Sequence, residues 1–184
     1  MNKENEARYQ LIDIDTINPA LMIYGTCPSI FGEIFVAKSE MGILAIEFTE
    51  GDWKACLRRA ILKFRPNRVE RVNEIAKEFV KAYTQQNLSY LDNIKLLIRG
   101  TDFQRKVWVE LTNIPFGHVT SYKDVADAIG QPKAVRAVAN AIASNPIAIM
   151  LPCHRVVHSD GTLSGYRWGA EVKEKLLLWE KDHS

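Results

Sequence analysis

The order of apolar and polar residues divides this chain into two halves of different construction. In the first half, short runs rich in β-branched and aromatic residues have the composition of strands. These strands are predicted over 32–37, 43–48 and 94–98. Residues 38–42 are typical of a hairpin turn, and apolar residues at spacings of three and four predict helices over 53–64 and 69–83. The first half is therefore expected to be a small α+β unit.

The second half reads as short helices with clear start and stop signals. Thr101–Gln104 and Ser121–Asp124 are capping boxes. In such a box the hydroxyl of the first residue accepts from the backbone amide of the fourth residue, and the side chain of the fourth accepts from the backbone amide of the first. Gly130 is a good left-handed helix terminator, and Pro132 suits the first turn of the next helix, predicted over 131–144. A short helix, a tight turn and a longer helix make a helix-turn-helix pattern.

The helix over 131–144 has two different faces. Its core side is expected to be Val135, Val138 and Ile142. Its opposite face carries Lys133, Arg136, Ala137, Asn140 and Ser144. Two cations without an acid favour contact with DNA phosphates, and small residues let a helix approach a surface closely. The alternative is an ordinary solvated face.

Composition limits the class of protein. The 184 residues are 47% hydrophobic, which suits one large domain or two small ones. The net charge of +2 confines any nucleic-acid contact to a local patch. No apolar run is long enough to span a bilayer. Residues 1–20 are expected to form a flexible tail.

Three cysteines occur, without the paired spacing of a four-cysteine zinc site. An odd number of cysteines, with no recognisable signal peptide, leads us to expect free thiols and a reducing cytoplasm. Cys27 and Cys56 are interpreted as structural, because Cys56 lies on the apolar stripe of its helix and Cys27 in a strand or loop.

Cys153 differs, because it follows an apolar run, 147–151, that predicts a buried strand, and precedes His154 and Arg155. The thiolate is the reactive form of cysteine, and nearby cationic or proton-accepting groups favour it. Neighbours in an extended chain point to opposite faces, so a link from Cys153 to His154 needs a turn or a bridging water. The rival interpretation is a buried structural thiol beside a surface histidine.

The segment after Cys153 supplies the remaining elements. Residues 156–157 predict a short strand, 159–162 a turn that could form a wing, and 165–169 an aromatic loop. A final amphipathic helix is expected over 171–181. The carboxylates of this helix that could orient His154 are Glu171, Glu174 and Glu180, and spacing alone does not choose among them.

These motifs together resemble the O6-alkylguanine-DNA alkyltransferase family, in the form of the C-terminal part of its adaptive-response members. The residues that carry the resemblance are Asn145-Pro146, Leu151-Pro152-Cys153-His154-Arg155-Val156-Val157 and Gly165-Tyr166-Arg167-Trp168-Gly169, with Ser121-Tyr122 and 133–138 at matching distances upstream. The resemblance is strong from about residue 99 onward and weaker over 22–98. It implies a ribonuclease-H-like α+β domain over 21–98 and a winged-helix-like, helix-turn-helix domain over 99–184.

The resemblance also implies the reaction. An alkyl group, chiefly methyl, would pass irreversibly from O6 of guanine, and from O4 of thymine, to Cys153 after the base is flipped out of the DNA. Each molecule would act once, without cofactor or metal. A thiolate is a suitable nucleophile for displacement at carbon. The implied partner is double-stranded DNA, bound through the minor groove by a monomer in a bacterial cytoplasm.

Roles follow residue by residue from the same resemblance. His154 would deprotonate Cys153 through a water, Glu180 would hold His154, and Asn145 would stabilise the turn before the cysteine. Tyr122 would help to rotate the nucleotide, and it would protonate the base or donate a hydrogen bond to it as the base leaves.

The resemblance places the other site residues on the DNA. Arg136 would fill the vacated stack, beside Lys133, Ala137 and Asn140. The carbonyls of Cys153 and Val156 would accept from the guanine amino group. Tyr166, Arg167 and Trp168 would line the pocket, and the bulk of Trp168 suggests the hypothesis that methyl is preferred over benzyl-sized groups. The rival functions are a lesion sensor, which would lack the acceptor cysteine, a winged-helix regulator and a cysteine hydrolase.

Overall fold

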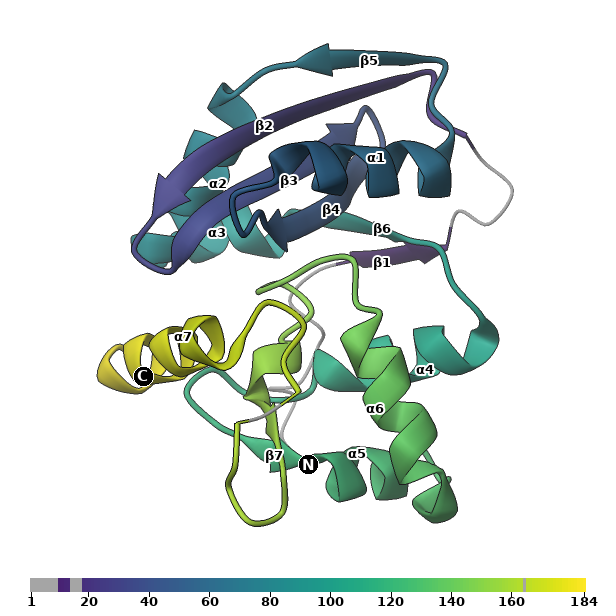
Figure 1. Cartoon of the computed structure of the whole chain (residues 1–184), viewed down its shortest axis with the longest axis vertical. Coiled ribbons are helices and arrows are strands. Elements are labelled where there is room, and N and C mark those ends of the chain that lie inside the picture. Colours follow the sequence, from purple (N-terminus) through teal and green to yellow (C-terminus); the bar gives the residue numbers. More distant parts are fainter. Residues whose placement is uncertain (1–9, 14–17, 164) are drawn as a thin grey trace. The chain divides into compact units, whose positions relative to one another are not determined.

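The computed structural model describes residues 10–13, 18–163 and 165–184. The chain divides into two compact units, Met1–Arg99 and Gly100–Ser184. Figure 1 shows that the first unit contains the long strands and that the second is built mostly from short helices. None of the described helices is both long and apolar enough to cross a membrane.

A six-stranded sheet forms the first unit, with strand order β1-β6-β4-β3-β2-β5. Its strands are β1 (Gln10–Asp13), β2 (Leu21–Ser29), β3 (Gly32–Ser39), β4 (Gly42–Phe48), β5 (Arg68–Arg71) and β6 (Lys95–Ile98). β2, β3 and β4 are antiparallel, whereas β1 and β4 pair in parallel with β6 and β5 pairs in parallel with β2. The predicted strands at 32–37, 43–48 and 94–98 are confirmed as β3, β4 and β6.

Three helices accompany the sheet: α1 (Trp53–Phe64), α2 (Glu74–Thr84) and α3 (Leu88–Asp92). α1 agrees with its prediction and is capped at its start by Asp52, whose carboxylate accepts from the Ala55 amide at 3.0 Å. Its buried stripe packs Cys56 and Phe64 with sheet residues such as Phe35 and Leu97. Burial of this apolar surface, at roughly 25 cal/mol per Å², is the main force that holds α1 on the sheet.

The helix predicted over 69–83 is wrong in its first part. Arg68–Arg71 form the edge strand β5, and α2 begins only at Glu74. The local spacing of apolar residues favours a helix over 69–72. Parallel pairing with β2 outweighs that preference, and residues 68–71 form a strand instead. β2 itself was not predicted as a strand, and it contains Cys27.

The tail expected over 1–20 is also corrected, because residues 10–13 form β1 beside β6. Residues 1–9 and 14–17 lie outside the described part of the chain.

The second unit begins with the two predicted capping boxes. In α4 (Asp102–Leu111) the Gln104 amide donates to the Thr101 hydroxyl at 3.2 Å, and the Thr101 amide donates to the Gln104 side chain at 3.0 Å. In α5 (Tyr122–Ala128) Ser121 and Asp124 make the same exchange, both at 3.1 Å. Both boxes are confirmed, so each satisfies amides that would otherwise lack partners at a helix start.

The helix-turn-helix pattern is confirmed at the same positions. Gly130 ends α5 with a φ of 72°. Pro132 then opens a 3₁₀ turn, Pro132–Ala134, which leads into α6 (Val135–Ala143). The remaining elements are a 3₁₀ turn at Cys153–Arg155, the parallel pair β7 (Thr120–Ser121) and β8 (Val156–Val157), and α7 (Ala170–Asp182).

The predicted strand over 147–151 is wrong, although all five residues are buried. The backbone turns instead: the Leu151 amide donates to the Ile147 carbonyl at 3.1 Å, and Ile149 has a φ of 70°. A short apolar run does not by its pattern distinguish a strand from other buried conformations. Here Asn145 bonds the Ile147 amide and the Leu151 carbonyl, which replaces the bonds of a strand ladder.

Candidate active site

Cys153 starts a 3₁₀ turn at the end of this buried segment. Its side chain is buried, and the Val156 amide donates to the Cys153 carbonyl, which closes the turn. The turn supplies the non-extended geometry that a cooperation between Cys153 and His154 requires.

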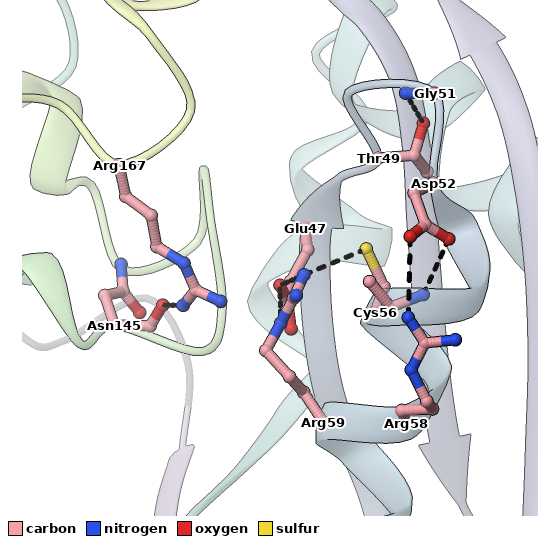
Figure 2. Close-up of polar contacts among 10 residues, drawn as sticks. Glu47, Thr49, Gly51, Asp52, Cys56, Arg58, Arg59, Asn145 and Arg167 are labelled. Atoms are coloured by element: carbon pink, nitrogen blue, oxygen red, sulfur yellow. Dashed lines mark hydrogen bonds and ion pairs between the residues drawn. The ribbon is translucent and has the colours of Figure 1, made fainter.

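Asn145 connects the end of α6 to the sulfur. Its Nδ2 donates to Cys153 Sγ at 3.1 Å and to the Leu151 carbonyl at 2.7 Å, while its Oδ1 accepts from the Ile147 amide at 2.9 Å. Asn145 is fully buried, so these bonds are shielded from water. Its own carbonyl accepts from Arg167 Nη1 at 3.0 Å (Figure 2). Asn145 therefore sets both the shape of the turn and a donor to the thiol.

His154 is fully buried against Glu180, with Nε2 and Oε1 2.7 Å apart. Of the three candidate carboxylates, Glu180 is thus the one at the histidine. Glu171 and Glu174 are exposed, and Glu171 pairs with Lys175 at 2.7 Å.

Glu180 is itself held by Arg155. Arg155 Nε donates to Oε2 at 2.8 Å and Nη2 donates to Oε1 at 3.0 Å, while Nη1 donates to the Ile114 carbonyl at 2.6 Å. Burial raises the pKa of Glu180, but the charge and hydrogen bonds of His154 and Arg155 outweigh it and place that pKa well below its usual range. Glu180 therefore remains a carboxylate and accepts from His154 Nε2–H.

The imidazole of His154 is neutral at neutral pH. Burial lowers the pKa of His154, and the charges of Arg155 and Lys173 lower it further against the opposing influence of Glu180. With Nε2–H donated to Glu180, the other ring nitrogen, Nδ1, carries the lone pair. Nδ1 is buried and has no hydrogen-bond partner among the described residues. His154 can therefore act as a proton acceptor at Nδ1.

The thiol needs such an acceptor. Burial raises the pKa of Cys153, and the hydrogen bond from Asn145, the neighbouring Tyr166 and the charge of Lys173 offset only part of that effect. The resting sulfur is therefore protonated, and its nucleophilic form requires removal of the proton within the site.

Aromatic residues from two elements complete the site. Tyr122 opens α5, and burial together with the thiolate of Cys153 raises its pKa. Tyr166 packs edge-on against the buried Trp168 at 5.4 Å between ring centroids. The Arg167 guanidinium stacks on Trp168 at 5.0 Å. The loop is joined to the site through Arg167, which donates to the carbonyl of Asn145.

Two family models match the chain. The 6-O-methylguanine DNA methyltransferase DNA binding domain matches residues 102–182, and the ribonuclease-like domain of the same family matches residues 22–95. A Methylated-DNA–protein-cysteine methyltransferase of Methanosarcina barkeri is 38% identical over 162 residues, which are 88% of this chain and 99% of that protein. The chain belongs to the 6-O-methylguanine DNA methyltransferase family.

Other relatives agree. The Escherichia coli bifunctional transcriptional activator/DNA repair enzyme Ada is 43% identical over 157 residues, which are 83% of this chain but 43% of that protein. The crystal structure of the Mycobacterium tuberculosis O6-methylguanine methyltransferase superposes with a TM-score of 0.72 at 31% identity, covering 89% of this chain and 94% of that one. The OGT of the same organism, in complex with DNA, gives 0.71 at 32% identity, covering 88% and 94%. The predicted α+β fold, a ribonuclease-like domain followed by a DNA-binding domain, is confirmed.

In this family member, α6 presents the face expected to meet DNA. Arg136, Ala137 and Asn140 of α6 are exposed, opposite the buried Val138 and Ile142, and Lys133 is exposed in the 3₁₀ turn that precedes the helix. Ser144 belongs to the packing side instead, since its hydroxyl bonds Gln104 at 2.9 Å and the Ala141 carbonyl at 2.8 Å. Ala141 is likewise buried, so the small residues on the exposed face are Ala137 and Ala143.

Sequence reasoning missed two residues of the alkyltransferase site. Arg155 was noted only as a neighbour of the cysteine, yet it fixes Glu180. The lysines and arginines beyond Lys133 and Arg136 are predicted from the sequence to lie on solvated faces. This prediction is wrong for Lys173, which is fully buried and donates to the Val156 carbonyl at 2.6 Å. Its signal was available: a lysine three residues before Leu176 and seven before Glu180 falls on the inward stripe of the last helix.

Proposed function

We propose that this chain repairs DNA by moving one alkyl group, chiefly methyl, from O6 of guanine to its own Cys153. The observation that carries the proposal is the buried thiol that accepts from Asn145 beside a neutral histidine with an open nitrogen. Family membership supplies the substrate class. O4 of thymine presents the same alkyl–oxygen bond, and we include it in the proposal.

The proton is removed first. A water between Cys153 and His154 Nδ1 would pass the thiol proton to the imidazole, and Glu180 would stabilise the imidazolium that forms. Because Arg155 keeps Glu180 ionised, this stabilisation is present before the reaction begins. The buried site strengthens it further, because water screens the charges less there.

Transfer then follows in one displacement. The sulfur forms a bond to the methyl carbon as the carbon–O6 bond breaks, and the electron pair moves into the guanine ring. The guanine then takes up, by way of water, a proton equivalent to the one that the thiol gave to His154, and so leaves as neutral guanine. The Tyr122 hydroxyl donates a hydrogen bond to the leaving base, a role that its raised pKa favours because the phenol keeps its proton. The thioether is stable, so the site is consumed and the reaction is irreversible.

The lesion has to leave the duplex before it can reach a buried thiol. We propose that α6 approaches the minor groove, where Ala137 permits close contact, Lys133 and Asn140 contact the backbone, and Arg136 fills the vacated stack. The Val156 and Cys153 carbonyls would accept from the guanine amino group. A carbonyl oxygen accepts two hydrogen bonds, so Val156 can bond Lys173 and the base together.

The surroundings of the site complete the proposal. The Arg167 amide and Tyr166 would lie near O6, and Trp168 would limit the size of the transferred group. We further propose a monomer that works in a bacterial cytoplasm, in keeping with free thiols at Cys27, Cys56 and Cys153.

The test is stoichiometry. A duplex whose O6-methylguanine carries a labelled methyl group is mixed in increasing excess with a fixed amount of protein, and the label on the protein is counted. We expect a plateau at one methyl group per chain, with free guanine restored in the DNA. Continued release of label beyond one equivalent would contradict the proposal, because it would require a turnover enzyme.

A further inference from the structure

Lys173 is fully buried in α7, which is unusual for a lysine because an ammonium group is costly to remove from water. Glu180 lies two helical turns later on the same stripe, with Leu176 between them. α7 therefore carries one cation and one anion into the interior of its unit.

The ammonium group has a defined backbone partner. Lys173 Nζ donates to the Val156 carbonyl at 2.6 Å and lies 5.9 Å from the centroid of the Tyr166 ring. Val156 directly follows the turn that holds Cys153, and its amide closes that turn. Lys173 thus fixes the strand β8 immediately after the reactive turn.

The charges of the buried groups do not balance while the thiol is protonated. Arg155 and Glu180 neutralise each other. In the described part of the chain, no carboxylate forms an ion pair with Lys173. Burial lowers the pKa of Lys173 and raises the pKa of Cys153, and the charge of each group opposes the effect of burial on the other. The thiolate is therefore the anion that would balance the buried ammonium.

We propose that Lys173 is a positioning residue of the transfer reaction, whose buried ammonium is the counter-ion of the Cys153 thiolate and whose N–H holds the Val156 carbonyl in place. Lys173 transfers no proton in this role, since His154 takes the proton of the thiol. The holding of Val156 rests on the proposed function, whereas the charge pair concerns the thiol alone. The other titratable and charged groups around the pair are Tyr122, His154, Arg155, Tyr166 and Glu180.

The test compares Lys173→Met with Lys175→Met on the same helix. Lys175 is half-exposed and pairs with Glu171, so it controls for the loss of one lysine from α7. The thiolate of Cys153 is titrated by its ultraviolet absorbance, as the difference between each protein and its Cys153→Ser counterpart. We expect Lys173→Met to raise the pKa of Cys153 by about one unit, and Lys175→Met to leave it unchanged.

The transfer rate should fall less than the thiolate population. One pKa unit removes about nine-tenths of the thiolate at neutral pH, but a more basic thiolate is intrinsically more reactive, so the net loss from charge alone is about threefold. Lys173→Gln keeps an N–H donor without the charge. We expect it to share the shifted titration but to bind the lesion duplex more tightly than Lys173→Met does.

An unshifted titration in a folded Lys173→Met protein would overturn the proposal. If Lys173→Met does not fold, the pKa of the Lys173 ammonium is measured by NMR in the unaltered chain and in Cys153→Ser. Coupling is reciprocal, so loss of the thiolate must lower the pKa of Lys173, and equal values in the two proteins would overturn the proposal. Neither titration needs DNA, so a shift in a protein that transfers no methyl group would support the charge pair and contradict the proposed function.

Discussion

Each unit of this molecule buries a cysteine close to a carboxylate that is bonded to an arginine, yet only one of the two sites is built for chemistry. In the first unit, Arg59 donates to Glu47 at 2.7 and 3.0 Å and to Cys56 Sγ at 3.2 Å, as Figure 2 shows. In the second, Arg155 binds Glu180 through two nitrogens, and Glu180 also holds His154.

The difference lies in the proton acceptor. Residues 1–99 contain no histidine, so Cys56 has no imidazole in its own unit. Cys153 is followed by His154, whose Nδ1 is kept open by the bond on the opposite nitrogen, and it receives an amide hydrogen bond from Asn145. An arginine–glutamate pair beside a buried thiol is therefore compatible with simple packing. A neutral base held by that pair makes the thiol a nucleophile.

Replacing the carboxylate by an amide should lower the free energy of unfolding by very different amounts at the two sites. The Arg155 side chain is 10% exposed, so Glu180→Gln leaves a buried charge without its partner, which costs about 3–5 kcal/mol. The Arg59 side chain is 46% exposed and water can solvate it, so Glu47→Gln should cost about 1 kcal/mol or less. Urea unfolding of both variants measures the difference, and equal losses would show that the two pairs are equivalent.

Asn145→Ala should have the next largest effect, because it leaves the buried Ile147 amide without its acceptor and removes one of the two hydrogen bonds to the Leu151 carbonyl, which keeps the bond from the Cys153 amide at 2.7 Å. A buried amide without an acceptor costs about 1–3 kcal/mol. The loss of the Nδ2 donor should also raise the pKa of Cys153 and slow transfer. Thermal unfolding, with the exposed Asn140→Ala in the preceding helix α6 as the control, measures the first effect. An unchanged melting temperature in Asn145→Ala would contradict the account of the turn.

Acid should destabilise the second unit through His154. Because burial lowers the pKa of His154 in the folded state, the unfolded chain takes up this proton first as the pH falls. The contribution of the neutral imidazole is present above about pH 6.5 and is lost below it, by at most about 1.4 kcal/mol per pH unit.

Unfolding free energies at about pH 7.5 and about pH 5.5 test the sign. His154→Gln should lose less stability over this interval than the unaltered chain. His118→Gln, at an exposed position, should behave as the unaltered chain does. If the stability of His154→Gln fell more steeply with decreasing pH than that of the unaltered chain, the pKa of His154 would be raised by folding and not lowered.

The smallest effect is expected on the DNA-facing surface. Arg136 of α6 and Arg58 of α1 are both exposed arginines on helices, one in each unit. Arg136→Ala should weaken binding to lesion DNA and reduce the salt dependence of the affinity by about one ion, while Arg58→Ala changes neither. Fluorescence anisotropy at several salt concentrations measures the affinity and its salt dependence. If Arg136→Ala and Arg58→Ala showed the same salt dependence, α6 would not be part of the DNA interface.

The sequence predicted those parts of the fold that local chemistry decides. Both capping boxes, the terminator Gly130 and the helix α1 follow from hydrogen bonds or spacings within a few residues. The errors occur where distant partners decide. Arg68–Arg71 is a strand because β2 lies beside it, and 147–151 turns because the Asn145 side chain supplies its bonds. Neither partner can be read from the local pattern.

In the active site, too, residues that form a local motif could be predicted from the sequence, and residues that depend on distant partners could not. Cys153 and His154 are visible as a motif, but the choice of Glu180 over Glu171 and Glu174 came from the family resemblance and not from spacing. The contributions of Arg155, which binds Glu180 of α7, and of Lys173, which lies on α7, depend on where α7 packs. Periodicity indicates only that this helix has an inward stripe. Burial and pairing, which give these residues their chemistry, exist only in the folded unit.

The most direct test of the central claim is to ask which cysteine carries the methyl group. The protein is incubated with a duplex containing one O6-methylguanine, its intact mass is measured, and the modified peptide is identified. We expect a gain of one methylene, located on Cys153, which Cys153→Ala abolishes and Cys56→Ala preserves. A gain located on Cys27 or Cys56, or no gain while the lesion duplex is bound, would contradict it.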